Sequence, residues 1–380
     1  MTPVAWLSQL WSGLKPQRTL PREGLPLSEG HEPVSQDTLA AIQELSRAVR
    51  NNPDAVEIYL ALGNLFRSQG EIERAVHIRE SLIVRPGLDD RFRARAWYEL
   101  GRDFKRAGLM DRALNAFTRA RELWGDNVET LRELADLAAG QGDFEVAARH
   151  FERLHQPVAQ AHYLVRLAES AHARGDQAQG RKWLDRALAV HPGSVEAWSL
   201  RINLALNQGN VDQLGAALRK GLENVAPSLR FLLMEALVNA GARPPLGLVA
   251  GENACLSLEQ MKSVVLPVVA EHKDDLLLAY YAALLLLRCN EQDQARQWLH
   301  KAVALNQEFW PARLKLLRLD RDLQPLDPGF KQQLDFFVDQ AEEVKRFVCS
   351  RCGIKSKRVF HVCPRCHSWH SIAFRTRLKD

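Results

Sequence analysis

Four cysteines near the C-terminus have the spacing that a single metal ion requires. Cys349 and Cys352 form one pair with two intervening residues, ten residues follow, and Cys363 and Cys366 form a second pair. Two such pairs place four thiolates on two tight turns, which can surround one tetrahedral ion. The alternative is a set of unrelated buried thiols or a disulfide pair. The regular spacing favours the metal site.

The residues around these cysteines fit the same interpretation. Gly353 follows the first pair and His367 the second, and turns of this kind often need the positive φ that both residue types tolerate. Four thiolates leave no open position for water, so a structural metal is predicted, either Zn or Fe. His361, His367 and His370 flank the site. Because the four cysteines complete the ligand set, we expect these histidines beside the ligands or at the surface.

Positive charge is concentrated in the same segment. The chain has 380 residues, is 46% hydrophobic and 26% charged, and carries a net charge of +5, which is typical of a soluble globular protein. From Val344 onward there are ten Lys or Arg residues and one acidic residue, a net charge of +9, so the remaining chain carries −4. Such a basic surface could bind nucleic acid, anionic lipid or an acidic protein.

A helical repeat precedes the metal segment. Five glycines are separated by 38, 34, 33 and 34 residues, namely Gly70, Gly108, Gly142, Gly175 and Gly209. A period near 34 is the signature of tetratricopeptide-type helical hairpins. The unit around Gly108 shows the pattern best, with Trp97, Leu100, Gly101 and Phe104 before the turn and Ala113, Phe117 and Ala120 after it. Small residues let the two helices approach closely, and the aromatic residues fill the space between hairpins.

The sequence therefore predicts five segments. Residues 1–20 form a short amphipathic N-terminal segment, and 21–36 form a linker rich in Pro and Gly. Residues 37–323 form an all-α tetratricopeptide-repeat solenoid, 324–346 a connecting helix, and 347–380 a rubredoxin-like metal-binding domain. Because the connecting helix runs into the metal segment, we expect the metal ribbon to be held against the solenoid.

Two stretches of the solenoid differ from the repeat. Between residues 227 and 273 the period blurs, and a cluster of Pro and Gly predicts an irregular hairpin with a longer loop. Residues 276–287 are apolar, but the run is shorter than the roughly 20 residues of a membrane-spanning helix. We therefore predict a buried helix there.

The first helices of stacked hairpins line a concave face, where peptides are often bound. We predict that protein partners bind there, and that carboxylates or an acidic peptide meet Asn64, Arg67, Arg95, Tyr98, Arg102 and Lys105. The alternative is that these residues are only the solvated face of amphipathic helices. Catalytic signatures are lacking: the sequence has no Gly-rich phosphate loop, no nucleophile elbow and no His-Glu-x-x-His. We predict that the protein is not an enzyme.

A helical-repeat array that ends in this metal motif resembles the lipopolysaccharide assembly protein B family of Gram-negative bacteria. The motif consists of Phe347, Cys349, Cys352, Gly353, Cys363, Pro364, Cys366 and Trp369. The resemblance implies that the four cysteines bind a metal and that the protein is an adaptor. It also implies that the adaptor regulates lipopolysaccharide synthesis by promoting proteolysis of the committed-step deacetylase through a membrane-bound protease.

The N-terminus departs from this family, which typically begins with a membrane-spanning helix. Residues 1–20 are too short and too interrupted to span a bilayer. Residues 4–14 have helical apolar spacing with Trp6 and Trp11, which predicts either a peripheral membrane anchor or a helix docked on the protein. We expect a cytoplasmic protein, with peripheral contact at the cytoplasmic face of the inner membrane if this helix is an anchor.

Two other functions remain as alternatives. A nucleic-acid-binding protein would use the basic ribbon against phosphates, with the repeats recruiting partner proteins, and exposed Phe360, Trp369 and Phe374 would suit it. An electron-transfer protein would use iron in the four-cysteine site, but this leaves the long solenoid without a role. The adaptor hypothesis uses both parts of the chain.

Overall fold

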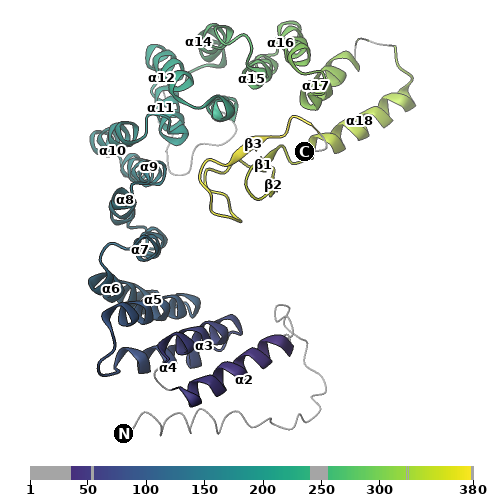
Figure 1. Cartoon of the computed structure of the whole chain (residues 1–380). Coiled ribbons are helices and arrows are strands. Elements are labelled where there is room, and N and C mark those ends of the chain that lie inside the picture. The colour runs from purple at the N-terminus through teal and green to yellow at the C-terminus, as the bar shows by residue number, and fades with distance from the viewer. Residues whose placement is uncertain (1–35, 53–54, 240–255, 322, 324, 378–380) are drawn as a thin grey trace. The chain divides into compact units, whose positions relative to one another are not determined.

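The computed structural model describes residues 36–52, 55–239, 256–321, 323 and 325–377 (Figure 1). The chain forms two compact units that divide after Leu82. The predicted N-terminal segment and all of the predicted linker except Gln36 lie outside the described residues. Within these residues the protein is mainly helical, with one small sheet near the C-terminus. The prediction of an all-α solenoid with a small metal ribbon is confirmed.

The first unit contains α2 (Gln36–Asn51), α3 (Val56–Ser68) and most of α4 (Ile72–Ile83). Helices α3 and α4 pair through a small residue on one helix and a large one on the other. A Cβ atom on Gly63 would lie 2.6 Å from the guanidinium carbon of Arg79, which is fully buried. Arg79 donates hydrogen bonds to the backbone carbonyl of Leu60 at 2.9 Å and to Asn64 Oδ1 at 2.7 Å. Because Gly63 has no side chain, the guanidinium group of Arg79 can pack against α3.

The second unit continues as successive helical hairpins. The first four hairpins contain α5 (Asp90–Arg106), α6 (Met110–Trp124), α7 (Val128–Gly140), α8 (Phe144–Arg153), α9 (Pro157–Ala173), α10 (Gln177–Val190), α11 (Val195–Asn207) and α12 (Val211–Asn224). The remaining helices are α13 (Phe231–Asn239), α14 (Leu258–Ala270), α15 (Leu276–Arg288), α16 (Gln292–Leu305), α17 (Trp310–Arg321) and α18 (Pro328–Glu342).

The turn glycines explain why hairpins form at these positions. All five glycines that mark the repeat have positive φ values, between 66° and 82°. This conformation strains most other residues, and it lets the chain reverse directly after a helix. At Gly108, for example, the amide of Leu109 donates to the carbonyl of Phe104 at 2.9 Å, closing the end of α5. The turn positions predicted from the repeat period are confirmed.

Close helix pairing also depends on a small residue in α5. A Cβ atom on Gly101 would lie 2.7 Å from the ring of Phe117 in α6, closer than atoms can approach without displacement. Phe117 is fully buried. The aromatic ring therefore fills the space that the missing Gly101 side chain leaves, as the repeat pattern predicts.

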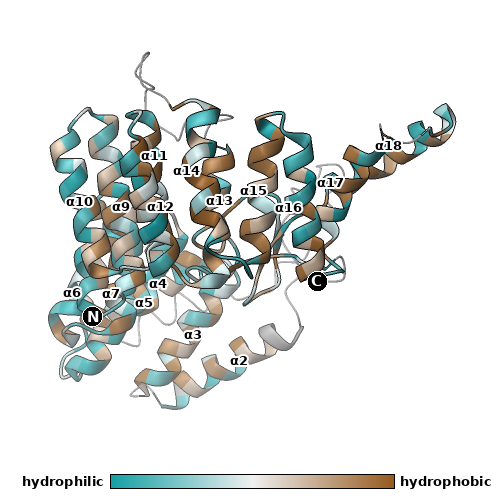
Figure 2. Cartoon of the chain, turned by 90° about the horizontal axis from the view of Figure 1, so that it is seen from above, coloured by the Kyte–Doolittle hydropathy of each residue, from teal (hydrophilic) through white to brown (hydrophobic). Residues whose placement is uncertain are grey.

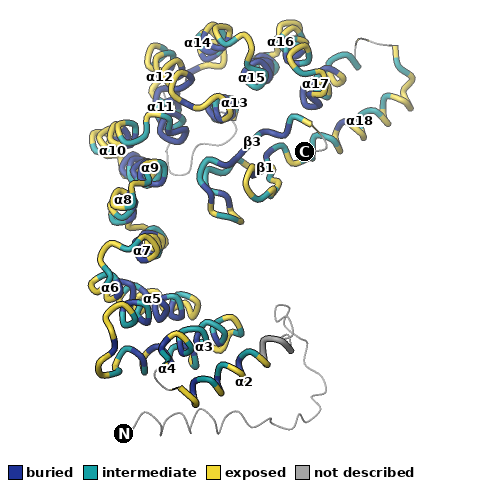
Figure 3. Tube along the Cα trace, viewed as in Figure 1, coloured by how far each residue is buried: buried dark blue, intermediate teal, exposed yellow. Residues whose placement is uncertain are grey.

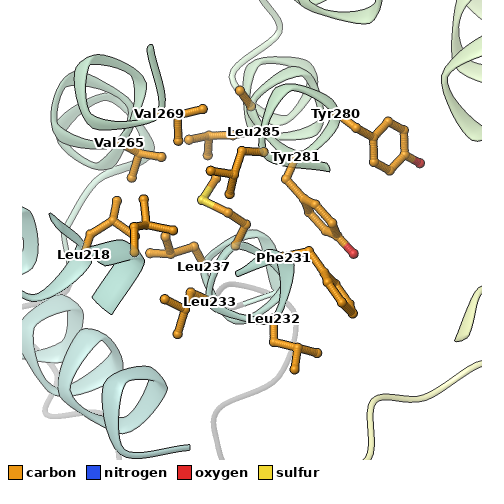
Figure 4. Packing of buried hydrophobic residues seen from close by; sticks show 14 of the residues in the cluster. Leu218, Phe231, Leu232, Leu233, Leu237, Val265, Val269, Tyr280, Tyr281 and Leu285 are labelled. Carbon is orange, nitrogen blue, oxygen red and sulfur yellow. The ribbon is translucent and has the colours of Figure 1, made fainter. Parts of the chain in front are cut away.

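The central core of the second unit surrounds α13 and α15, two of the most apolar helices (Figure 2). Side chains from α12, α13, α14 and α15 converge there, and the rings of Phe231 and Tyr281 lie side by side (Figure 4). Residues 278–283 are all buried, which confirms the buried helix predicted for residues 276–287. No helix in the described part of the chain has both the length and the apolar character needed to cross a membrane.

The stretch with a blurred repeat period is only partly described. A short 3-10 helix, Pro227–Leu229, precedes α13, and α14 begins at a capping box in which Ser257 and Gln260 bond each other's backbone. The longer loop predicted between these helices falls on residues 240–255, outside the described residues. It stays a prediction.

The C-terminal segment forms a three-stranded antiparallel sheet. The strands are β1 (Phe347–Cys349), β2 (Lys355–Ser356) and β3 (Ile372–Phe374), with β1 in the centre. Strands β1 and β3 each have buried positions at both ends (Figure 3). Phe347, Ile372 and Phe374 of these strands belong to the same core cluster as α13 and α15. The predicted contact between ribbon and solenoid is thus a shared apolar core.

Candidate metal centre

Two tight turns bring the four predicted cysteine ligands together. Their Sγ atoms all lie within 4.8 Å of one another. The Sγ atoms of Cys352 and Cys363 are 3.5 Å apart, and those of Cys349 and Cys366 are 3.8 Å apart. Sulfur ligands about 2.3 Å from a tetrahedral ion lie about 3.8 Å from one another. The four thiols therefore fit one metal ion with little rearrangement.

The backbone of each turn explains this geometry. The amide of Gly353 donates to the carbonyl of Cys349, and the amide of His367 donates to the carbonyl of Cys363, both at 2.9 Å. Gly353 has a φ of 73° and His367 a φ of 52°. The predicted positive φ after each cysteine pair is confirmed. Each turn thus folds the second cysteine of its pair back towards the first.

Polar groups favour the thiolate forms of Cys349 and Cys366. Ser371 Oγ lies 3.3 Å from Cys349 Sγ, the amide of Arg351 donates to the same sulfur at 3.4 Å, and Ser368 Oγ lies 3.0 Å from Cys366 Sγ. Burial acts to raise the pKa of Cys349, but hydrogen bonds from Ser371 and from backbone amides outweigh it and lower the pKa to about 5. Thiolate is the form of cysteine that binds metals.

The donor set matches one structural ion. A tetrahedral site of four thiolates is closed to substrate and water, so its metal holds the two turns together. Both Zn and Fe are compatible with four thiolates. The ribbon is a short segment with little apolar interior of its own, and metal binding in such a segment contributes directly to folding.

The histidines that flank the cysteines have separate roles. His367 is exposed, whereas His361 and His370 face Glu196, the second residue of α11. Glu196 Oε2 lies 2.8 Å from His370 Nε2, and Oε1 lies 3.2 Å from Nδ1 of His162 in α9. Burial acts to raise the pKa of Glu196, but hydrogen bonds from His162 and His370 outweigh it and hold this pKa well below its ordinary range. Sequence reasoning missed this cluster.

The basic residues of the ribbon are not all available at the surface. Arg375 is buried and donates to a backbone carbonyl at 2.8 Å. Arg346 lies 3.5 Å from Glu235 of α13, and Lys357 forms an ion pair with Glu343. The charge of +9 counted in the sequence therefore overstates the open basic surface.

The aromatic residues of the ribbon pack inward. Phe374 is 7% exposed, and the ring of Trp369 contacts Phe151 and Tyr163, with centroids 6.1 and 6.0 Å away. Phe360 is partly buried against the central core. The exposed aromatic platform expected for nucleic-acid binding is therefore wrong for Phe374, because the solenoid uses this ring to complete its own core.

The predicted partner-binding residues of α5 are engaged with neighbouring side chains. Arg95 and Arg102 lie 3.1 and 3.4 Å from the buried carboxylate of Glu99, and Lys105 lies 2.6 Å from Glu133 of α7. Tyr98 is only 7% exposed. The spacing places it opposite the packed face, but its ring contacts residues of α6 and lies beneath two guanidinium groups.

The predicted residues of α3 lie in the first unit. Asn64 Oδ1 accepts hydrogen bonds from Arg67 at 2.9 Å and from the buried Arg79 at 2.7 Å. Asn64 therefore has a structural role within its own hairpin. Its part in partner binding stays a prediction.

A groove with a volume of about 660 Å³ lies between the ribbon and three helices of the solenoid. The helices are α9, α11 and α13. The charged and histidine side chains along it are His162, Arg166, Glu169, Glu196, Glu235, Arg346, Lys357, Arg358 and His361. Single-sequence reasoning had no signal for this groove, because its walls are separated by up to about half of the chain.

Comparison with known proteins finds the same two parts. The rubredoxin metal binding domain family matches residues 347–373, and the tetratricopeptide repeat family matches residues 35–82 and 98–162. Lipopolysaccharide assembly protein B of Escherichia coli (strain K12) is 24% identical over 342 residues, which cover 85% of this chain and 82% of that protein. The protein of the same name from Haemophilus influenzae is 29% identical over 187 residues, covering 48% of this chain and 47% of that protein.

Solved structures of repeat proteins are more distant. The C-terminal part of a tetratricopeptide repeat-containing protein from Cytophaga hutchinsonii is 12% identical with a TM-score of 0.36, covering 74% of this chain and 95% of that one.

Proposed function

From the premise that this chain belongs to the lipopolysaccharide assembly protein B family, we propose that it is a non-enzymatic adaptor that regulates lipopolysaccharide synthesis. The adaptor binds the committed-step deacetylase and presents it to a membrane-bound protease. It works at the cytoplasmic face of the inner membrane. In this proposal the metal is structural, and the protein itself catalyses no reaction.

The observation that supports the proposal is the groove shared by the ribbon and the solenoid. Its lining comes from three repeat helices on one side and from residues 346–361 on the other. Both cations and carboxylates line it, which suits a polar peptide segment of a client protein better than an apolar ligand. A groove of this kind exists only while the ribbon is docked.

The metal acts in this mechanism by keeping the ribbon folded. The four-cysteine site fixes both turns, and the flanking strands β1 and β3 carry Phe347 and Phe374 into the solenoid core. Docking in turn holds Arg346, Lys357 and Arg358 along the groove. Loss of the metal removes one wall of the groove, while the helices of the other wall stay folded.

A second partner surface is proposed on α5, where Arg95, Arg102 and Lys105 are half-exposed. These cations pair with carboxylates of α5 and α7, so a partner's carboxylates must compete with them. The Lys105–Glu133 pair is partly exposed and contributes about 0.2–1 kcal/mol, so its exchange costs little, whereas the fully buried Glu99 must keep a guanidinium partner. The surface therefore suits a weak additional contact with an acidic segment.

Nucleic-acid binding is less well supported. Sequence-tolerant binding of single strands needs exposed aromatic rings beside cations. Phe374 and Trp369 contact the solenoid instead. The side chains of Lys355, Lys357 and Arg358 are still exposed. An experiment must therefore distinguish the adaptor function from nucleic-acid binding.

The test is affinity co-purification from the native cell with membranes retained. The wild-type protein is compared with a Cys349→Ser/Cys352→Ser variant. The matched control is Cys289→Ser, which changes a half-buried cysteine outside the ribbon. We expect the wild type and the control to recover the deacetylase and the protease, and the double variant to lose both. Recovery of nucleic acid or ribosomal material, with neither protein, would refute the adaptor proposal.

A further inference from the structure

A second group of metal-binding side chains lies where the ribbon meets the solenoid. Glu196 comes from α11, and His361 and His370 come from the ribbon. One ligand atom from each lies within 4.8 Å of the other two. None of the three belongs to the four-cysteine site. Side chains that are far apart in sequence thus meet with the donor atoms of a metal site.

The contacts inside the group leave one donor atom without a partner. His370 Nε2 is 2.8 Å from Glu196 Oε2, a normal hydrogen bond. His361 Nδ1 is 3.7 Å from Glu196 Oε1, which is too long for one. This nitrogen is shielded from solvent and has no hydrogen-bond partner. Buried polar atoms without a partner are unusual in folded proteins, and an ion that binds there is one explanation.

The backbone positions the two histidines together. The amide of His370 donates to the carbonyl of His361 at 2.8 Å, beside a bridge between Val362 and Trp369. His370 has a φ of 47°, a conformation that few residues other than glycine adopt. Strained conformations of this kind persist where the surroundings fix them, often at binding sites. Here the strain directs His370 at the buried carboxylate.

Neighbouring groups hold that carboxylate in place. His162 Nδ1 lies 3.2 Å from Glu196 Oε1, and Ser194 Oγ lies 3.5 Å from Oε2. The ring of His191 stacks on His370 with centroids 6.0 Å apart. Metal ligands in proteins are typically oriented by such hydrogen-bonded and stacked neighbours. The group therefore has supporting contacts as well as ligands.

We propose that Glu196, His361 and His370 form a second metal site, which takes a divalent transition-metal ion and clamps the ribbon to α11. Two imidazoles and a carboxylate suit Zn²⁺ and similar ions better than Mg²⁺ or Ca²⁺, which prefer oxygen ligands. Ligands about 2.1 Å from a tetrahedral ion lie about 3.4 Å apart, so separations of up to 4.8 Å must close by at most about 1.4 Å through rotation of the side chains. Three protein ligands would leave a fourth position on such an ion, and Glu196 and His361 also line the groove.

The test measures how many ions the full chain binds. Protein stripped of metal is titrated with Zn²⁺ under reducing conditions, and again with Co²⁺, whose thiolate charge-transfer bands report the four-cysteine site alone. We expect two equivalents in the wild type, one with sulfur ligands and one with nitrogen and oxygen ligands. X-ray absorption at the metal edge then shows light-atom ligands for the second equivalent.

Variants identify the ligands. Glu196→Gln is expected to bind one equivalent and to keep the thiolate bands, whereas Cys349→Ser/Cys352→Ser loses those bands. His300→Gln, which changes an exposed histidine of α16, is expected to keep two equivalents. If Glu196→Gln loses its helical circular dichroism, the metal titration is repeated with His370→Gln instead. A wild type that binds a single equivalent with sulfur ligands only would overturn the proposal, as would two equivalents in a folded Glu196→Gln variant.

Discussion

Phe374 joins the ribbon to the solenoid through a set of aromatic contacts. Its ring lies within 5.8 to 6.3 Å of five other aromatic rings, those of Phe231, Tyr280, Tyr281, Phe309 and Phe347. Aromatic pairs at these separations add to the free energy that burial alone provides. A single residue of the ribbon thus contacts α13, α15 and Phe309, the residue before α17.

Replacing this ring should destabilise the second unit. We expect Phe374→Ala to lower the free energy of unfolding by about 3–5 kcal/mol, because it leaves a cavity between five rings. The measurement is denaturant unfolding followed by circular dichroism. Phe337→Ala is the matched control, since Phe337 is 66% exposed on α18, and its effect should stay below about 0.5 kcal/mol. Equal effects for the two variants would contradict the assigned role of Phe374.

At the scale of elements, α18 differs from the helices before it. Only Val338 of this helix is buried, and Phe330, Phe336 and Phe337 are each more than half exposed. Its contacts with α17 include ion pairs of Arg318 with Asp339 and Glu342, and of Lys315 with Glu342. A helix held in this way depends on charge more than on apolar burial.

The docking of α18 should therefore depend on pH and salt. Burial acts to raise the pKa of Glu342, but Lys315 and Arg318 outweigh it and lower the pKa below 4.5. Because the folded pKa is the lower one, the stabilisation is complete above the unfolded pKa and is lost as pH falls through the folded pKa. Glu342 is partly exposed, so Glu342→Gln should cost below about 1 kcal/mol.

Hydrogen exchange of the α18 amides at neutral pH measures this effect. The Glu342→Gln variant should exchange faster than the wild type, and high salt should reduce the difference. Glu122→Gln is the control, because Glu122 pairs with Arg119 of its own helix α6. Unchanged protection of α18 in the Glu342 variant would show that the ion pairs do not hold this helix.

Sequence reasoning succeeded where the signal is local. The turn glycines and the cysteine pairs determine their own conformations within a few residues, so the hairpins and the two cysteine turns follow from spacing. Contacts such as Glu196 with His370 join residues that are 174 positions apart. No periodicity in one sequence connects such positions, so the histidine cluster could not be predicted. Tyr98 was expected on the surface that meets a partner, but its ring is buried against side chains of α6. Such contacts between helices cannot be read from spacing within one helix.

At the scale of the molecule, the ribbon is both a metal-dependent module and a part of the solenoid core. Its fold depends on four thiolates, whereas its position depends on Phe347, Ile372 and Phe374. The fold of the ribbon and its position can be tested separately. Metal removal acts directly on the fold, whereas substitutions in the aromatic core act directly on the position. This division predicts how far the effect of metal loss extends.

Metal removal should unfold the ribbon and leave most of the helices intact. In Cys349→Ser/Cys352→Ser, the thiolate-bound ion should be lost, and helical circular dichroism should fall only slightly. The free energy of unfolding should fall by several kcal/mol, because α13 and α15 lose their aromatic contacts with the ribbon. Metal analysis and thermal unfolding measure the two effects. Complete loss of helicity would refute the separable ribbon.

The shared aromatic core also has a consequence for protein synthesis. A ribosome makes α13 and α15 before it makes Phe347 and Phe374, so the nascent solenoid carries Phe231 and Tyr281 with part of their contacts missing. Only a completed ribbon with its ion covers these rings. We therefore expect a chain made in a cell starved of the metal to keep an apolar surface of the kind that chaperones and proteases recognise, and to be degraded faster than the metal-bound protein.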